Sequence, residues 1–182
     1  MNEKQSLRLS KFLSLVLRHQ PSAIGITLDS QGWVDVDKLL KQLAAHGRKA
    51  SRDKLEHIVA TNNKKRFLFS EDGHRIRANQ GYSIKIDLGL APTTPPETLL
   101  HGTATRFLES IRASGLLPGT RQHVHLSENH GTALQVGGRY GKPIVLIVKS
   151  GEMHRTNHDF FLSENGVWLT NKVAPEFIVL TD

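Results

Sequence analysis

The chain has 182 residues and no cysteine, which excludes a disulfide framework, a thiol nucleophile and the cysteine-based zinc sites. Its 38% of hydrophobic and 23% of charged residues are typical of a globular protein. The net charge is +7, and the first 90 residues carry all of the excess, with 16 Lys and Arg against 9 Asp and Glu. This asymmetry predicts a polyanionic partner for the first half, nucleic acid before anionic membrane, and the alternative is a basic surface without a partner.

The sequence also bears on location. The first residues lack the uninterrupted apolar stretch and the small-residue cleavage site of a signal peptide. No apolar run approaches the ~20 residues that a membrane-spanning helix needs. We therefore expect a cytoplasmic protein that does not contact a membrane.

The first half begins with an amphipathic pattern. Apolar residues between Leu9 and Val16 follow the i, i+3, i+4 and i+7 spacing of a helix. This helix is predicted to end near Arg18-His19, because the residue before Pro21 is disfavoured in the helical conformation. At a helix end, Arg18 and His19 are either cations that stabilise the negative end of the helix dipole or part of a functional site.

Two short strands and two helices are predicted to follow. The strands are expected over residues 24–28 and 33–36. Asp37 is predicted to cap a helix over residues 38–46, and Ser51 to cap the next helix, since both side chains are good N-caps.

A hairpin is predicted to close the first half. Asp72-Gly73 is a strong turn signal, and it lies between short runs at 67–69 and 75–77 that are suited to strands. Three helices followed by a hairpin is the element order of a winged-helix-like module, a common nucleic-acid-binding arrangement. This is an analogy of fold, and function has to be argued from the site.

Two arginines lie on the second strand of this hairpin. Arg75 and Arg77 are predicted to project from one face, while Ile76 points into the core. A guanidinium donates bidentately and does not lose its proton, so the pair suits a phosphate better than general-base chemistry. The alternative is a solvated strand face with ordinary surface arginines. Trp33 is interpreted as a core aromatic.

The second half differs in pattern. Residues 91–97 contain three prolines, which disfavour helix and central strand, so we place a linker there between lobes at 1–90 and 98–182. The periodicity predicts many short strands and only two helices, as follows: helices over 106–114, capped by Thr105, and over 132–136; strands over 124–127, 144–148, 160–162, 167–169 and 177–180. The predicted fold class is α+β, with a winged-helix-like first lobe and a strand-rich second lobe.

The chemistry of the residues narrows the choice of site. His123 with His125, and His154 with His158, have spacings that could suit a metal, but no HExxH motif accompanies them and the last pair is not predicted to be helical. We expect no metal. A Walker loop, a GxGxxG turn after a strand and a GxSxG elbow are all absent. The remaining inventory is rich in Arg and His and poor in carboxylates, which suits phosphate binding.

Several motifs carry a family resemblance. In order, they are Arg18-His19-Gln20-Pro21, Gly32-Trp33-Val34, the IRANQG run of residues 76–81 preceded by Arg75, His101-Gly102-Thr103, Val124-His125-Leu126-Ser127, and residues 163–170. Together they resemble the RNA 2′-phosphotransferase family of the bacterial KptA type. The resemblance covers nearly the whole chain, and it implies a winged-helix-like RNA-binding lobe followed by a lobe with the ADP-ribosyltransferase fold.

The resemblance also implies a reaction. Such an enzyme removes an internal 2′-phosphate from RNA, of tRNA type, and consumes NAD+ as co-substrate without a metal. The 2′-phosphate first attacks the nicotinamide ribose and expels nicotinamide. The ribose 2″-hydroxyl then attacks phosphorus, which yields 2′-OH RNA and ADP-ribose 1″,2″-cyclic phosphate. The expected partners are RNA and NAD+, and we expect a monomer.

Residue roles follow from the same resemblance. The catalytic residues are expected to be Arg18, His19, Arg77 and Arg139. Contacts to the substrate phosphate or the RNA are expected from Arg75, Asn79 and Gln80. NAD+ is expected to bind to His101, Gly102, Thr103, His125 and Ser127.

Two positions depart from the family pattern, and two other functions stay open. Tyr82 stands where the family usually has His, and Leu100 where it often has Tyr. Either departure is expected to lower affinity or to alter the pH profile.

The alternative functions are a transferase that ADP-ribosylates a terminal phosphate of nucleic acid, and a non-enzymatic winged-helix protein that binds nucleic acid and senses NAD+.

Overall fold

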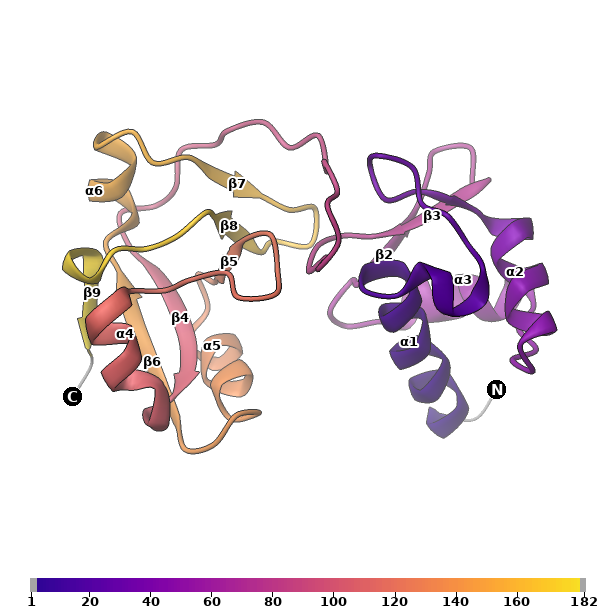
Figure 1. Ribbon diagram of the computed structural model, residues 1–182, viewed down its shortest axis with the longest axis horizontal. Coiled ribbons are helices and arrows are strands. Elements are labelled where there is room, and N and C mark those ends of the chain that lie inside the picture. The colour runs from indigo at the N-terminus through magenta and orange to yellow at the C-terminus, as the bar shows by residue number, and fades with distance from the viewer. Residues whose placement is uncertain (1–2, 181–182) are drawn as a thin grey trace. The chain divides into compact units, whose positions relative to one another are not determined.

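A computed structural model describes residues 3–180, and the chain divides into two compact units, Met1–Gly89 and Leu90–Asp182. Each unit combines helices with antiparallel strands around its own hydrophobic core, so the predicted α+β class is confirmed (Figure 1). Across residues 3–180, no helix has both the length and the apolar composition needed to cross a membrane.

The first unit contains, within its described residues, three α-helices, a 3-10 turn and a sheet with strand order β1-β3-β2. The elements are α1 (Glu3–Arg18), η1 (Pro21–Ile24), β1 (Val34–Asp35), α2 (Val36–Ala45), α3 (Arg52–Thr61), β2 (Phe67–Phe69) and β3 (Arg75–Ala78). Both strand pairs are antiparallel. The helices bury one face against the sheet, where Leu13, Leu39 and Ile76 are fully buried.

Much of the predicted order of this unit is confirmed. Helix α1 ends at Arg18, and Ser51 caps α3 by accepting a hydrogen bond from the Lys54 amide. The hairpin forms with Phe67 opposite Ala78, and Gly73 adopts a φ of +70° in its turn. The hairpin therefore places Arg75 and Arg77 on β3, in the centre of the sheet.

Two predictions for this unit are wrong. Residues 24–28 do not form a strand, because Pro21 starts a 3-10 turn that ends at Ile24 and is closed by Gly25 in the left-handed region. The cap of α2 is Asp35 rather than Asp37, since its carboxylate accepts a hydrogen bond from the Lys38 amide at 2.8 Å. The helix therefore begins at once after β1.

The second unit contains, within its described residues, two three-stranded antiparallel sheets, with strand orders β4-β6-β9 and β5-β8-β7. The elements are β4 (Leu99–Ala104), η2 (Thr105–Phe107), α4 (Leu108–Ser114), β5 (Val124–Leu126), α5 (His130–Gly137), β6 (Pro143–Val148), α6 (Ser150–Arg155), β7 (Phe160–Leu162), β8 (Trp168–Thr170), η3 (Pro175–Phe177) and β9 (Ile178–Leu180). The two sheets meet where Leu100 and Ser127 exchange backbone hydrogen bonds of 2.8 and 2.9 Å.

The predicted strands and the two predicted helices of this unit are confirmed within two residues at each end, whereas β4 and α6 were not predicted. Thr105 does not cap a helix: it opens the 3-10 turn η2, and α4 starts at Leu108. Helix α6 was missed, because its sequence includes a glycine and lacks an apolar period. Tertiary contacts stabilise it instead, since the Ser150 hydroxyl donates to the Pro96 carbonyl and Met153 is fully buried.

The proline-rich segment 91–97 is hydrogen-bonded to the second unit. The Thr93 amide donates to the Phe160 carbonyl at 2.8 Å, and Glu97 accepts two hydrogen bonds from the Arg155 guanidinium. These bonds lower the pKa of the Glu97 carboxyl. The segment thus packs along β7 and α6 of its own unit.

Candidate functional site

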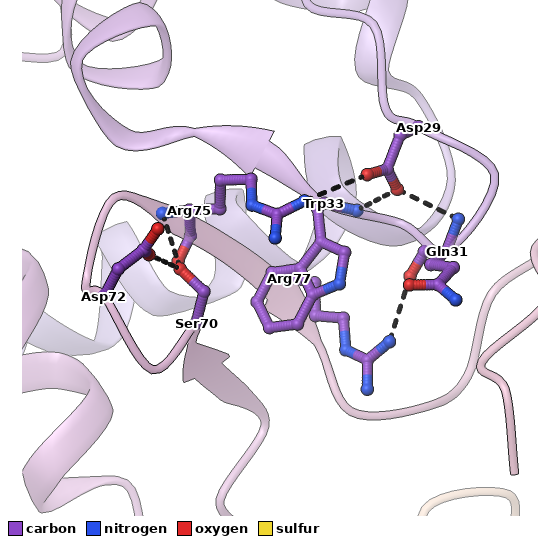
Figure 2. Close-up of polar contacts among 7 residues, drawn as sticks. All are labelled: Asp29, Gln31, Trp33, Ser70, Asp72, Arg75 and Arg77. Carbon is purple, nitrogen blue, oxygen red and sulfur yellow. Dashed lines mark hydrogen bonds and ion pairs between the residues drawn. The ribbon is translucent and has the colours of Figure 1, made fainter.

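Arg77 is a buried cation without a carboxylate partner. Its side chain is only 8% exposed, and its Cζ lies 4.5 Å from the centre of the Trp33 ring (Figure 2). Nη1 donates to the Gln31 carbonyl at 3.3 Å, whereas Nε is buried without a partner. Among residues 3–180, no Asp or Glu forms an ion pair with it. A guanidinium in this state is suited to bind an anion.

Arg75 lies on the same face, as the strand alternation predicted, but its environment differs. Its Cζ lies 5.4 Å from the centre of the Trp33 ring, and its Nη1 is paired with the Asp29 carboxylate at 3.6 Å. The interpretation of Trp33 as a core aromatic is wrong, because the ring is half-buried and contacts both guanidiniums. The period of a strand places two residues on a face, but it does not reveal what covers that face.

The end of α1 meets the segment that follows β3. Arg18 Nη2 donates to the Arg66 carbonyl at 3.5 Å, and the same carbonyl accepts the Asn79 amide at 2.9 Å. His19 Nδ1 lies 2.9 Å from the Ser83 hydroxyl, and the Ser83 amide donates to the Arg18 carbonyl at 3.0 Å. The structure therefore brings the Arg-His pair and the ANQG run together, although 58 residues separate His19 from Ala78 in the sequence.

Tyr82 is buried beside the Arg-His pair and the ANQG run. It is 1% exposed, and its hydroxyl donates to the Ala78 carbonyl at 2.8 Å. Burial raises the pKa of Tyr82 to about 12, although the charges of Arg77 and Arg18 act to lower it. Gly32, at a φ of +84°, leaves room for the phenol, because a Cβ there would overlap the Tyr82 oxygen. Tyr82 is therefore a neutral, buried hydrogen-bond donor.

Asn79 and Gln80 are placed differently from each other. Asn79 is 7% exposed, and its side-chain amide donates to the Lys65 carbonyl. Its Oδ1 is buried without a partner. Lys65 has a φ of 39°, unusual for a residue with a side chain, so the Asn79 bond holds a strained turn. Gln80 is half-buried.

His101 occupies the junction of the two sheets in the second unit. Its Nδ1 lies 3.0 Å from the His125 carbonyl, which accepts only, so Nδ1 carries the proton. Burial lowers the pKa of His101, and the bond to the His125 carbonyl opposes this shift. The ring is therefore neutral near pH 7, and Nε2 is a hydrogen-bond acceptor for a ligand.

Gly102 and Thr103 form the contact between β4 and α5. A Cβ on Gly102 would overlap the Ala133 carbonyl of the helix, and a Cβ on Gly137 would overlap the Thr103 carbonyl. The helix backbone thus lies directly on the strand at two points. The glycine of the HGT motif has a packing role that the motif alone did not reveal.

Of the other expected residues of this unit, Ser127 and Arg139 lie beyond the two ends of α5, and His125 lies on β5. Ser127 and Asn129 are hydrogen-bonded to each other ahead of the helix, and Asn129 caps it through the Thr132 amide at 2.8 Å. Arg139 is exposed, two residues after the helix ends. His125 faces Arg121, whose guanidinium is 3.0 Å from Nδ1.

The remaining histidines are dispersed. His123 packs on the Phe161 ring at 5.8 Å, and burial lowers its pKa. His154 lies in α6, although that stretch was not predicted to be helical. In the described part of the chain, no three His, Asp or Glu side chains are grouped so that they could hold a metal ion.

Sequence reasoning missed the contacts made by residues 29–33. Gln31 and Trp33 contact Arg77, and Asp29 pairs with Arg75; the GWV motif was the only signal that pointed toward this segment. The chain is thus an α+β protein whose first unit contains a candidate anion site with more arginine than carboxylate side chains.

Comparison with known proteins agrees with this class. The model of the "RNA 2'-phosphotransferase, Tpt1 / KptA family" matches residues 4–172, and the chain belongs to that family. A relative from Agrobacterium fabrum, named "Probable RNA 2'-phosphotransferase", is 54% identical over 97% of this chain and 95% of its own length. Proteins of the same name from Pseudomonas aeruginosa and Streptomyces griseus are 52% and 49% identical, over 98% and 99% of both chains in each pair.

Proposed function

We propose that this protein removes an internal 2′-phosphate from RNA and consumes NAD+ as its co-substrate. The family match across residues 4–172 carries the proposal. In the proposed reaction a 2′-phosphate oxygen bonds to the anomeric carbon of the nicotinamide ribose, and the bond to nicotinamide breaks. The ribose 2″-hydroxyl then attacks phosphorus, the bond to the RNA 2′-oxygen breaks, and the proton passes to that oxygen. The products are 2′-OH RNA and ADP-ribose 1″,2″-cyclic phosphate.

Arg77 is the side chain that we assign to the phosphate. Nη1 is occupied by the Gln31 carbonyl, whereas Nη2 makes no hydrogen bond with described residues and Nε is buried and unpaired. These two nitrogens form the side-on edge of the guanidinium, which matches two oxygens of a phosphate. A phosphate that reaches this edge would also satisfy the buried Nε–H, whose lack of a partner costs about 1–3 kcal/mol.

Arg18 and His19 complete the proposed phosphate site in the first unit. Arg18 and Arg77 both act on the Tyr82 hydroxyl through their charges, so the two guanidiniums lie near one buried group. A phosphate dianion is already a nucleophile and needs no strong base, so its orientation and charge are what the site has to control. The Ser83 hydroxyl orients His19, which we assign to orient the phosphate or to donate a hydrogen bond in the second step.

The second unit is assigned to NAD+. The neutral His101 ring offers Nε2 as an acceptor, which fits a ribose hydroxyl or a carboxamide N–H. Thr103 and Gly102 set the distance between β4 and α5, and α5 leads into Arg139, which we assign as a further phosphate ligand. NAD+ supplies the electrophilic carbon and the leaving group, and these residues orient it.

We also propose that the first unit is a winged-helix-like RNA-binding lobe and the second an ADP-ribosyltransferase-like lobe. Three helices followed by the β2-β3 hairpin support the first assignment, together with the net charge of +7 carried by residues 1–90. The two short antiparallel sheets that meet at Leu100 and Ser127 support the second.

The test is incubation of the protein with NAD+ and a short RNA that bears one internal 2′-phosphate. Nicotinamide release and the fate of the phosphate are followed in the same samples. Loss of the 2′-phosphate together with formation of the cyclic phosphate product is the expected result.

Two other outcomes would contradict the proposal. RNA binding without nicotinamide release would indicate a protein that binds NAD+ without consuming it. ADP-ribose retained on the nucleic acid, above all on a terminal phosphate, would indicate a transferase that stops after the first step. An RNA with a 3′-terminal phosphate and a 2′-hydroxyl is the matched control substrate.

A further inference from the structure

A single loop fixes the Arg77 guanidinium. This loop, residues 29–33, precedes β1 and contacts Arg77 twice, through the Gln31 carbonyl at 3.3 Å and the Trp33 ring at 4.5 Å (Figure 2). The ring contact and the hydrogen bond to the carbonyl act on different parts of the guanidinium, so together they restrict its orientation. Both constraints leave the edge formed by Nε and Nη2 without a protein partner.

The Asp29 carboxylate holds this loop together. Its Oδ1 accepts hydrogen bonds from the backbone amides of Gln31 and Trp33, both at 2.9 Å, and its Oδ2 is paired with Arg75 at 3.6 Å. The Asp29 amide in turn donates to the Trp33 carbonyl at 2.9 Å. Hydrogen bonds to a charged acceptor are roughly twice as strong as neutral ones. One side chain therefore closes the loop and ties it to β3.

The two arginines of the strand consequently have different charge environments. Asp29 compensates the charge of Arg75, whose side chain is 50% exposed. Arg77 is 8% exposed and has no carboxylate partner among the described residues. Strand alternation alone does not distinguish the two arginines, but in the structure a carboxylate compensates the charge of Arg75 and none among the described residues compensates that of Arg77.

We propose that Trp33 is a positioning residue for Arg77, and that the Asp29 carboxylate, with its charge compensated by Arg75, holds Trp33 in place. Arg75 then serves the loop and not the RNA phosphate. This inference rests on the proposed function, since it takes Arg77 as the phosphate ligand. The indole ring has no oxygen or nitrogen acceptor, so its contact with the guanidinium leaves the N–H donors at the edge available for oxygen ligands.

The measurement is the affinity for two RNAs of one sequence, one with an internal 2′-phosphate and one with a 2′-hydroxyl, without NAD+. Their affinity ratio reports phosphate recognition, because a general loss of RNA binding or of folded protein lowers both affinities together. We expect Trp33→Leu to lower the ratio about tenfold, the order of a desolvated cation–π contact, and Trp33→Phe to retain most of it. In an Arg77→Ala background, Trp33→Leu is expected to change the ratio less than about twofold.

Two further variants serve as controls. Phe12→Leu removes the ring beneath Arg48, whose Cζ lies 3.8 Å from the centre of the Phe12 ring elsewhere in the same unit, and is expected to leave the ratio unchanged. Arg75→Met is expected to lower the ratio less than about threefold, since Asp29 still binds both loop amides.

The possible failures are distinguishable. If the unsubstituted protein does not prefer the 2′-phosphorylated RNA, the assignment of Arg77 to the phosphate is wrong, and with it the proposed function. If the preference exists but Trp33→Leu leaves it intact, or lowers it equally in the Arg77→Ala background, only the positioning role is wrong. A loss on Arg75→Met as large as that on Arg77→Ala would show that Arg75 binds the phosphate directly.

Discussion

Substitution of Gly102 by alanine tests whether the HGT glycine is needed for packing. A Cβ at this position would lie 1.6 Å from the Ala133 carbonyl oxygen and 2.4 Å from its carbon. Both are backbone atoms of α5, so a rotamer change cannot relieve the overlap. The helix would have to retreat until the oxygen lies beyond 3.0 Å, and its second close contact, between Gly137 and the Thr103 carbonyl, resists that movement.

The expected cost of Gly102→Ala is about 3 kcal/mol in the free energy of unfolding of the second unit, the upper end of the usual range for overpacking. For a unit of this size the midpoint of thermal unfolding should fall by roughly 12–24 °C. Each unit contains one of the two tryptophans, so fluorescence of Trp168 in a Trp33→Phe background follows the second unit alone.

The matched control is Gly138→Ala at the end of the same helix. Gly138 has a helical φ of −60°, and the nearest atom to an added Cβ is the Leu134 carbonyl oxygen at 3.5 Å. This variant should be neutral, or more stable by about 0.4–1 kcal/mol because the unfolded chain loses entropy. If Gly102→Ala unfolds at the same temperature as Gly138→Ala, the close approach of α5 to β4 is incorrect.

Three further predictions follow from individual contacts. Arg77→Ala should weaken transfer from 2′-phosphorylated RNA about 10- to 100-fold with NAD+ affinity intact, whereas His101→Ala should raise the NAD+ requirement. Steady-state kinetics with each substrate varied measure both effects. If both variants lost NAD+ affinity equally, the division of subsites would be wrong. Asp35→Ala should cost about 1 kcal/mol in urea unfolding of the first unit, and Asp37→Ala much less, because only Asp35 caps α2. Burial lowers the pKa of folded His101 below its ordinary 6.5, so the unfolded chain binds this proton more readily, and the second unit should lose stability as the pH falls below about 6.5. In unfolding measured from pH 7 to 5, His101→Gln should reduce this dependence of stability on pH. An unchanged dependence would assign it to other groups such as His123.

The sequence determined those features that depend on local chemistry. The apolar spacing of α1, the Ser51 cap and the Asp72-Gly73 turn were all readable, because each depends on residues within a few positions of one another. The alternation of β3 likewise placed Arg75 and Arg77 on one face. The order of the motifs was enough to indicate the family, which the comparisons confirm.

The tertiary structure decided the features that depend on partners distant in sequence. The cap of α2 fell to Asp35 because β1 pairs with β3 up to that residue, and the short helix α6 exists because neighbouring segments bury it. Local propensity is too weak to determine either outcome by itself.

The same distinction holds within the candidate site. Strand alternation alone did not distinguish Arg75 from Arg77, and the family resemblance gave Gly102 a role in NAD+ binding but none in packing. Only the folded chain places Asp29 beside Arg75, Trp33 across Arg77 and the α5 backbone against Gly102. Charge compensation, burial and close backbone approach arise between segments that the chain brings together, so they were decided by the tertiary structure alone.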